Sequence, residues 1–359
     1  MQAYALQKTV KDMGFDVVTA KSIAAKPTWR RMYTWAYYPL RRLVWKATGK
    51  WQEQERQRLL RSKYTDTFIE QHINTVDFFC GHSKPRKKLA DSYDIYIVGS
   101  DQVWRKFFMN IRTYFLDFLK NDTSKIKIAY AASFGMENLD DWTDKEMEDC
   151  RQLIQKFNAV SVREEQGKEM CLRLLGRNAE WVLDPSMLLT CEQYKTLIPL
   201  DMETGERNVF CYFLDKDDHK TRFASDVAAQ MGLDTFHFLP DRFDYLGFGS
   251  HDDYSFPSVE SWLKGFRDAG FVITDSFHGT VFSILFSKPF LCIGNTKRGI
   301  SRFTSLLRQM DLENRLVSAN DRIDIKSLPT IDYAKVQRTL NELRQQSFSF
   351  LRNALHQPV

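Results

Sequence analysis

Short apolar runs alternate with longer segments of helical spacing along most of the chain. The runs are rich in β-branched and aromatic residues, as buried strands are. A first series lies at 94–98, 126–130, 159–162 and 181–183, and a second at 208–213, 235–239, 271–274 and 290–293. Because strands that alternate with helices form βαβ units, the pattern predicts an α/β fold with two doubly wound, Rossmann-like parallel sheets.

A polar stretch separates the two series. Residues 198–207 contain a proline and a glycine and indicate a linker between domains. We therefore expect an N-terminal domain over 1–197 and a C-terminal domain over 198–330. The remaining segment, 331–359, has apolar residues at helical spacing, namely Val336, Leu340, Leu343 and Phe348. It is predicted to form a helix that packs back on the first domain.

The strand-to-helix junction within 271–287 is the first candidate site, because ligands of open α/β sheets bind beyond the carboxyl ends of the strands. His278 is expected at the positive N-terminal end of the helix, with Asp275 or Ser276 as the cap. A phosphate or carboxylate is favoured there, and Gly279 has no side chain to keep that ligand from the main chain. The alternative is that His278 only caps the helix.

A second candidate follows the run at 94–98. Gly99 and Ser100 allow a ligand to approach closely, and Asp101 and Gln102 offer hydrogen bonds to sugar hydroxyls. The alternative is a plain turn in which Asp101 caps the next helix.

A third candidate is Arg163, directly after the run at 159–162. Its guanidinium fork can grip a carboxylate or a phosphate with two parallel hydrogen bonds. The alternative is an ion pair with Glu164 or Glu165.

The loop after 290–293 carries three cations, Lys297, Arg298 and Arg302, and we expect one of them to face the site. The alternative is a solvated basic loop. Asp184, which precedes a proline, is interpreted as a structural helix cap.

The composition of the chain limits the classes of protein to which it can belong. The chain has 359 residues, 43% of them hydrophobic, and a net charge of +5. Its cysteines are scattered without a CxxC pair, and neither an acidic metal-binding set nor a glycine-rich nucleotide loop occurs, so we expect neither a metal nor a cofactor. An apolar run long enough to span a membrane and a secretory signal are also absent. A cytoplasmic protein is expected.

Residues 26–51 interleave aromatic with basic side chains. Aromatic rings and cations together suit the interface of an anionic membrane. The alternative is a solvated basic helix whose aromatic residues face the protein core. Nucleic acid is not expected as a partner, because the chain as a whole has only a small excess of positive charge.

Several motifs together carry a family resemblance. They are Val98–Trp104, Ala131–Gly135, Ser161–Glu164, Val182–Pro185 and Thr274–Gly279, in this order, and Ser301–Leu307 continues the series. In combination they resemble the polysaccharide pyruvyl transferase family, from about Gln2 to about Leu316. Each motif alone is weak, but the ordered set is fairly specific.

The resemblance implies a two-domain fold like that of the GT-B glycosyltransferases. It also implies transfer of a pyruvyl group from phosphoenolpyruvate to two hydroxyls of a sugar, which gives a cyclic ketal. An arginine and a histidine hold the donor in that family, and by motif they correspond to Arg163 and His278. Ser276 and Gly279 belong to the same expected donor site, together with one residue of the Lys297–Arg298 pair.

On the acceptor side, we expect Ser100, Asp101, Gln102 and Ser133 to bind the sugar. The acceptor is expected to be a lipid-linked precursor of a capsule or exopolysaccharide, met at the inner face of the membrane. Members of the family usually open with a strand and a glycine-containing loop. This chain starts inside the following helix, at Met1–Leu6, so the first domain is expected to lack that strand.

Two other functions stay open. A GT-B glycosyltransferase with a nucleotide-sugar donor would use the same architecture and the same anion site. An inactive member that binds glycans as a scaffold would keep the fold without the reaction.

Overall fold

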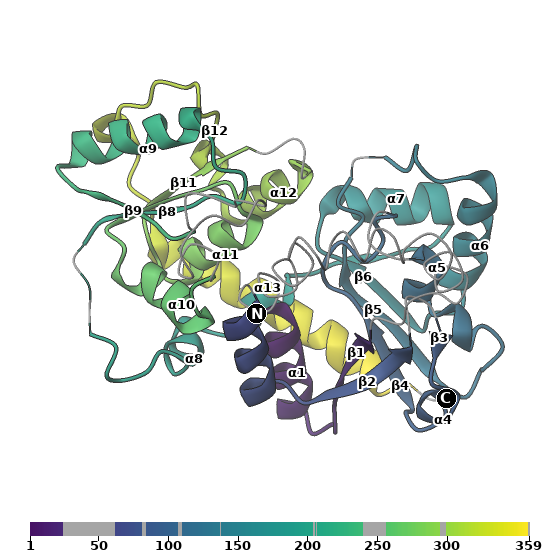
Figure 1. Cartoon of the computed structure of the whole chain (residues 1–359). Coiled ribbons are helices and arrows are strands. Elements are labelled where there is room, and N and C mark those ends of the chain that lie inside the picture. Colours follow the sequence, from purple (N-terminus) through teal and green to yellow (C-terminus); the bar gives the residue numbers. More distant parts are fainter. Residues whose placement is uncertain are drawn as a thin grey trace, which may run out of the picture.

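The computed structural model describes residues 1–23, 62–80, 84–106, 110–136, 138–203, 205, 207–239, 256–294 and 299–357. In this part of the chain, two parallel β-sheets lie in the two halves of the molecule, and each is covered by helices (Figure 1). Residues 26–51, Lys297 and Arg298 lie outside the described residues.

The first sheet has four parallel strands in the order β4-β5-β6-β7. Their bounds are Ile95–Val98, Ile126–Ala132, Ala159–Val162 and Glu180–Trp181. The helices on one face are α5 (Ile111–Tyr114), α6 (Asp144–Ile154) and α7 (Glu165–Leu175). Successive residues of β5 point to opposite faces, so Ile128 and Tyr130 pack against α1 (Gln2–Asp12) and the C-terminal helix on the other face.

The second sheet has five strands in the order β12-β11-β10-β8-β9, and all of its pairs are parallel. Their bounds in chain order are Val209–Tyr212, Thr235–His237, Phe271–Thr274, Phe290–Ile293 and Leu316–Val317. The helices on one face are α10 (Val259–Asp268), α11 (Phe277–Leu285) and α12 (Ser301–Met310), and α9 (Asp218–Met231) covers the other. β10 and β11 are wholly buried, as expected of strands covered on both faces.

A small third sheet joins β1 (Thr19–Ile23), β2 (Thr75–Cys80) and β3 (Lys84–Pro85). The side-chain amide of Gln7 on α1 fixes the start of β1 and β2, because it donates to Thr19 Oγ1 at 2.9 Å and to the Asn74 carbonyl at 2.8 Å. This sheet extends the first domain beyond the strands that the sequence predicted.

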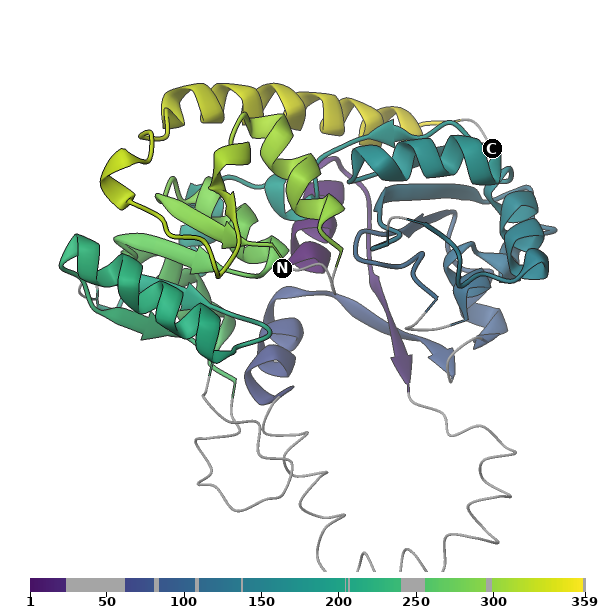
Figure 2. The ribbon, with the colours of Figure 1, turned by 90° about the horizontal axis from the view of Figure 1, so that it is seen from above.

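The C-terminal helix α13 (Tyr333–Leu355) runs across both domains (Figure 2). Val336 and Leu340 belong to the core of the second domain. Phe350 and Leu351, further along the helix, pack beneath the first sheet. One continuous helix is therefore buried against both sheets and joins the two domains.

The prediction of a mixed α/β fold with two parallel sheets is confirmed, and each predicted apolar run contains a strand except 181–183, which overlaps β7 only at Trp181. The domain boundaries and the missing first strand stay predictions. Among the described residues, we find no helix with the length and apolar character needed to cross a membrane.

The other helical elements are short. They are the α-helices α4 (Lys87–Ala90) and α8 (Cys191–Lys195) and the 3₁₀ turns Asp117–Leu119, Pro185–Met187, Glu313–Arg315 and Ile325–Ser327. The turn at Pro185–Met187, called η2, matters most, because it follows β7 and leads to the boundary between the domains.

Gly279 in the first turn of α11 packs directly on the end of β10. A Cβ at this position would lie 2.2 Å from Thr274 Oγ1. That hydroxyl donates to the Tyr212 carbonyl at 2.7 Å and accepts from the Ser276 N–H at 3.1 Å, so it has little freedom to move. Close packing of helix and strand therefore requires glycine here.

We expect Gly279→Ala to destabilise the protein by about 1–3 kcal/mol, because the added methyl group overpacks the junction. Gly167→Ala is the matched control, since Gly167 also lies in a helix and its nearest neighbour would be 3.3 Å from the new Cβ. The measurement is urea unfolding of both variants. Equal stability of Gly279→Ala and the wild type would contradict the packing argument.

Candidate active site

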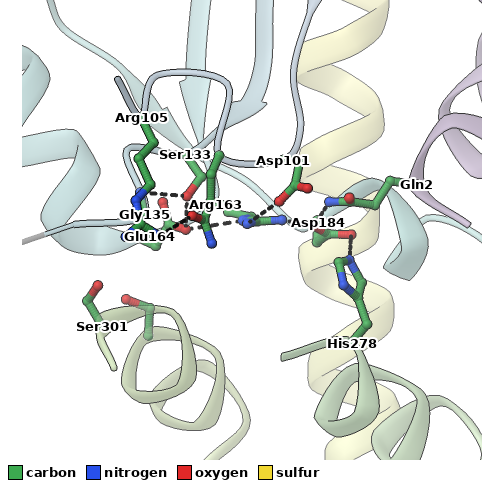
Figure 3. A network of polar contacts seen from close by, with 12 residues as sticks. Gln2, Asp101, Arg105, Ser133, Gly135, Arg163, Glu164, Asp184, His278 and Ser301 are labelled. Atoms are coloured by element: carbon green, nitrogen blue, oxygen red, sulfur yellow. Dashed lines mark hydrogen bonds and ion pairs between the residues drawn. The ribbon is translucent and has the colours of Figure 1, made fainter. Parts of the chain in front are cut away.

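The carboxylate of Asp184 lies where the two domains meet (Figure 3). It follows β7 and caps η2, where Oδ1 accepts from the Ser186 N–H at 3.0 Å and from the Ser186 hydroxyl at 2.5 Å. Its other oxygen, Oδ2, accepts from Gln2 Nε2 at 2.7 Å and from Arg163 Nη1 at 2.8 Å. Both oxygens are thus used, and the side chain is only 1% exposed.

Burial alone would raise the pKa of Asp184, but Arg163 and His278 outweigh burial and lower it to about 2. The group is therefore ionised at neutral pH. A fixed negative charge with saturated hydrogen bonds can orient neighbouring cations without itself exchanging protons.

Arg163, at the end of β6, has a side chain that is only 1% exposed. Its guanidinium donates from Nε to Glu164 at 3.1 Å, from Nη1 to Asp184 at 2.8 Å and from Nη2 to Asp101 at 3.3 Å. Burial disfavours the charge, but these carboxylates raise the pKa of Arg163 above its usual value. The ion pair with Glu164, the alternative interpretation of Arg163, is present.

The three partners of Arg163 differ in exposure. Asp184 and Glu164 are buried, whereas the side chain of Asp101 is 67% exposed and makes the longest of the three bonds. Burial opposes the ionisation of Asp101, but Arg163 and His278 lower its pKa overall. Asp101 is therefore the partner that an incoming anion can replace most easily.

Glu164 connects Arg163 to the loop that follows β5. Its Oε1 accepts from the Ser133 hydroxyl at 2.6 Å, and Ser133 in turn accepts from the Gly135 N–H at 3.1 Å. Burial raises the pKa of Glu164, although Arg163 opposes that effect. Ser133 thus holds the Glu164 carboxylate in place.

His278 comes from the second domain. It lies in the first turn of α11, which Ser276 caps by accepting from the Gly279 N–H at 3.3 Å. Its Nε2 is 3.9 Å from Asp184 Oδ1 and has no hydrogen-bond partner among the described residues. Desolvation lowers the pKa of His278 to about 4, and Asp184 offsets this only in part. The imidazole is therefore neutral at pH 7 and presents an unused nitrogen.

The sequence-predicted residues fall into two groups. Arg163, His278 and Asp101 meet around Asp184. The others serve local structure in the described chain: Ser276 is the helix cap, Gly279 packs on Thr274, Ser133 holds Glu164, and Gln102 accepts from Arg105 Nη1 at 2.8 Å.

Ser100 is buried, and its hydroxyl has no hydrogen-bond partner within the described ranges. The contact with Thr274 is sufficient to explain the absence of a side chain at Gly279. Asp275, the other predicted cap of α11, instead accepts from backbone N–H groups of the loop after β8 and pairs with Lys220 at 2.7 Å.

Sequence reasoning missed the central role of Asp184, which it treated as a cap only. The cap is present, but the same carboxylate also binds Arg163 and Gln2. Its position directly beyond a strand of the first series was the available signal. Among the described residues, no group of three His, Cys, Asp or Glu side chains is placed to hold a metal ion.

The chain is similar to known proteins in sequence and in structure. A family model described as "Polysaccharide pyruvyl transferase" matches residues 1–297 of the chain. Among solved structures, the UDP-GlcNAc 2-epimerase from Methanocaldococcus jannaschii is similar at 10% sequence identity and a TM-score of 0.42, over 78% of this chain and 82% of that chain. No curated protein matches the chain.

The neutral imidazole makes stability depend on pH in a defined direction. The pKa of His278 is about 4 in the folded protein and takes the ordinary value in the unfolded chain, so the unfolded chain binds more protons between these pKa values. Stability is therefore lost as pH falls through that window. At pH 5 the loss relative to pH 7.5 should be about 2 kcal/mol.

We expect His278→Gln to remove this part of the pH dependence, and His219→Gln, on the exposed side of α9, to keep it. Chemical denaturation at pH 7.5 and pH 5 measures the difference. The same loss of stability in His278→Gln as in the wild type would mean that His278 is not a desolvated neutral group.

Proposed function

Since the chain belongs to the polysaccharide pyruvyl transferase family, it is a transferase that acts on a sugar or glycan, and we propose that it transfers the pyruvyl group of phosphoenolpyruvate. The product is a cyclic ketal on two hydroxyls of the acceptor. Nothing in the reaction requires a cofactor, because phosphoenolpyruvate itself carries the activated group.

One observation supports this proposal above the others. An arginine from the first domain and a histidine from the second lie on opposite sides of one buried carboxylate, Asp184 (Figure 3). Phosphoenolpyruvate is a short molecule with a carboxylate at one end and a phosphate at the other. A cation and a helix N-terminus at a domain boundary suit two such anionic ends.

The donor carboxylate is proposed to bind Arg163 by replacing Asp101. The bonds to Asp184 and Glu164 leave the orientation of the guanidinium unchanged, while the longer bond to the exposed Asp101 is exchanged for the donor. Because one carboxylate replaces another, the number of negative charges that pair with the Arg163 guanidinium stays constant, and donor binding adds no excess negative charge to this buried position.

The donor phosphate is proposed to lie at the N-terminus of α11 beside His278. The imidazole is neutral in the free protein, with a pKa of about 4, and a phosphate dianion against it would raise that pKa. Donor binding therefore takes up a proton. His278 then carries that proton next to the bond that must break.

The proposed reaction is an addition followed by a displacement. In the addition, a proton is added to the methylene carbon, and one sugar hydroxyl forms a C–O bond to the adjacent carbon and loses its proton, so the number of protons does not change. In the displacement, the second hydroxyl forms another C–O bond to that carbon and loses its proton, and the bond from carbon to the phosphate oxygen breaks. Inorganic phosphate leaves with a proton, for which His278 is the proposed donor, and the proton of the second hydroxyl replaces it.

Asp101 is the proposed contact for the acceptor, because its carboxylate is exposed and is free to turn to a sugar hydroxyl once the donor has replaced it. Ser100 and Gln102 flank it as further proposed acceptor contacts. A lipid-linked acceptor, a capsule or exopolysaccharide product and docking of 26–51 on the inner face of an anionic membrane remain part of the proposal. They rest on the composition of that segment and on the family.

The proposal predicts release of inorganic phosphate from phosphoenolpyruvate in the presence of a glycan acceptor. Arg163→Lys keeps the charge but loses the fork, so the affinity for phosphoenolpyruvate should fall by about tenfold. His278→Gln should lower turnover by about 10²-fold. Arg308→Lys is the control, because Arg308 is an exposed arginine on α12 whose change should leave both constants near those of the wild type.

Phosphate release across a panel of lipid-linked glycans measures turnover, and the melting temperature with added donor measures binding. A rise in melting temperature with a nucleotide sugar, and none with phosphoenolpyruvate, would reject the proposal in favour of a glycosyltransferase. Normal turnover of His278→Gln would remove His278 from the mechanism.

A further inference from the structure

A second buried guanidinium lies next to the site. Arg302, in the first turn of α12, is only 7% exposed. Its Cζ is 5.7 Å from the ring centroid of Phe277, and the Cζ of Arg163 is 4.8 Å from the same centroid. Because Phe277 directly precedes His278, two guanidinium groups and the imidazole gather around one aromatic side chain.

The electrostatic surroundings shift the pKa values of the two guanidinium groups in opposite directions. Arg163 has carboxylates within hydrogen-bond distance at each of its nitrogens. For Arg302, burial and then repulsion by Arg163 lower the pKa to about 10, and the attraction of Glu164 and Asp101 offsets this only in part. The surroundings therefore disfavour the charge of Arg302, and a bound anion would relieve that penalty.

The start of α12, which carries Arg302, is held against the first domain on both sides of that residue. Ser305, one turn later on α12, accepts from the Glu165 N–H at 3.3 Å. On the other side, a Cβ at Gly299 would lie 2.6 Å from the Gly135 carbonyl oxygen, so the loop before α12 is pressed against the first domain. A cation fixed in this way is pre-organised for a ligand.

We propose that Arg302 is a second arginine of the donor site and binds the phosphate of phosphoenolpyruvate, while Arg163 binds the carboxylate. This inference rests on the proposed function and deepens it. The two guanidinium groups then give the site separate contacts for the two ends of the donor. The enzyme would select a molecule with both anionic groups over one that carries a carboxylate alone.

Three ligands differ in which of the two arginines they can contact. Phosphoenolpyruvate has both anionic ends, inorganic phosphate has only the end assigned to Arg302, and pyruvate has only the end assigned to Arg163. The side chain of Arg302 should therefore matter for the first two ligands and not for the third.

The test is isothermal titration of the wild type, Arg302→Gln, Arg302→Lys and Arg308→Gln with each of these ligands. Arg302→Gln should lower the affinity for phosphoenolpyruvate and for inorganic phosphate by tenfold or more, which is on the order expected for a lost charge-assisted contact. The affinity for pyruvate should stay within about twofold of the wild-type value. Arg302→Lys keeps the charge without the fork and should lie between Arg302→Gln and the wild type. Arg308→Gln should match the wild type, because Arg308 is exposed on the same helix.

Stability distinguishes a binding role from a structural one. Because burial and the charge of Arg163 both disfavour the charge of Arg302, the melting temperature of ligand-free Arg302→Gln should not fall below that of the wild type. If Arg302→Gln does not fold, Arg302→Lys tests the binding role instead. The ratio of its phosphoenolpyruvate affinity to its pyruvate affinity should be lower than the wild-type ratio.

Three results would overturn the inference. They are unchanged phosphoenolpyruvate affinity in folded Arg302→Gln, equal weakening of phosphoenolpyruvate and pyruvate, and an unchanged affinity ratio in Arg302→Lys. A wild type that binds neither phosphoenolpyruvate nor phosphate would instead reject the proposed function itself. The two failures are thus distinguishable.

Discussion

The Arg163 guanidinium is removed from water at the boundary between the two domains, and a buried charge is tolerated only when opposite charge lies against it. Asp184 and Glu164 supply that charge, and each is fixed in turn by other groups, Asp184 by Gln2 and Ser186 and Glu164 by Ser133. The site is therefore built outward from the need to neutralise one cation. Elements that are far apart in the sequence meet there for this reason.

The same constraint accounts for the electrostatics of the neighbouring groups. Desolvation lowers the pKa of His278 more than the charge of Asp184 raises it, so the imidazole stays neutral. Burial and repulsion by Arg163 lower the pKa of Arg302 more than the attraction of Glu164 and Asp101 raises it. The ligand-free protein thus combines a neutral base with a cation whose charge is disfavoured, and both favour the arrival of an anion.

Much of the fold follows from the sequence because buried parallel strands are continuous apolar runs, as in β10 and β11. The strands that were missed lack this signal. β1 and β2 include polar residues such as Lys21 and Asp77, and β12 has only two residues. These strands form because α1 and neighbouring strands provide partners, and a local pattern does not contain that information.

The candidate site could be predicted only in part for a related reason. Arg163 and His278 lie at strand ends, where chemistry is expected, but the pairing of Gln2 with Asp184 joins residues 182 positions apart. An aspartate before a proline has a sufficient local explanation as a cap, so its second role was not visible. Arg302 lies inside a helix, and its importance depends on the burial that packing creates.

The most direct test of this account is the unfolding free energy of Asp184→Asn, measured at pH 7 beside the wild type. If Asp184 neutralises the buried Arg163, removal of its charge should cost about 3–5 kcal/mol, the range seen when one partner of a buried ion pair is removed. The affinity for phosphoenolpyruvate should fall as well, since the guanidinium loses its orientation. A variant that is within about 1 kcal/mol of the wild type would contradict the central place given to this ion pair, because that small change is typical of an exposed pair.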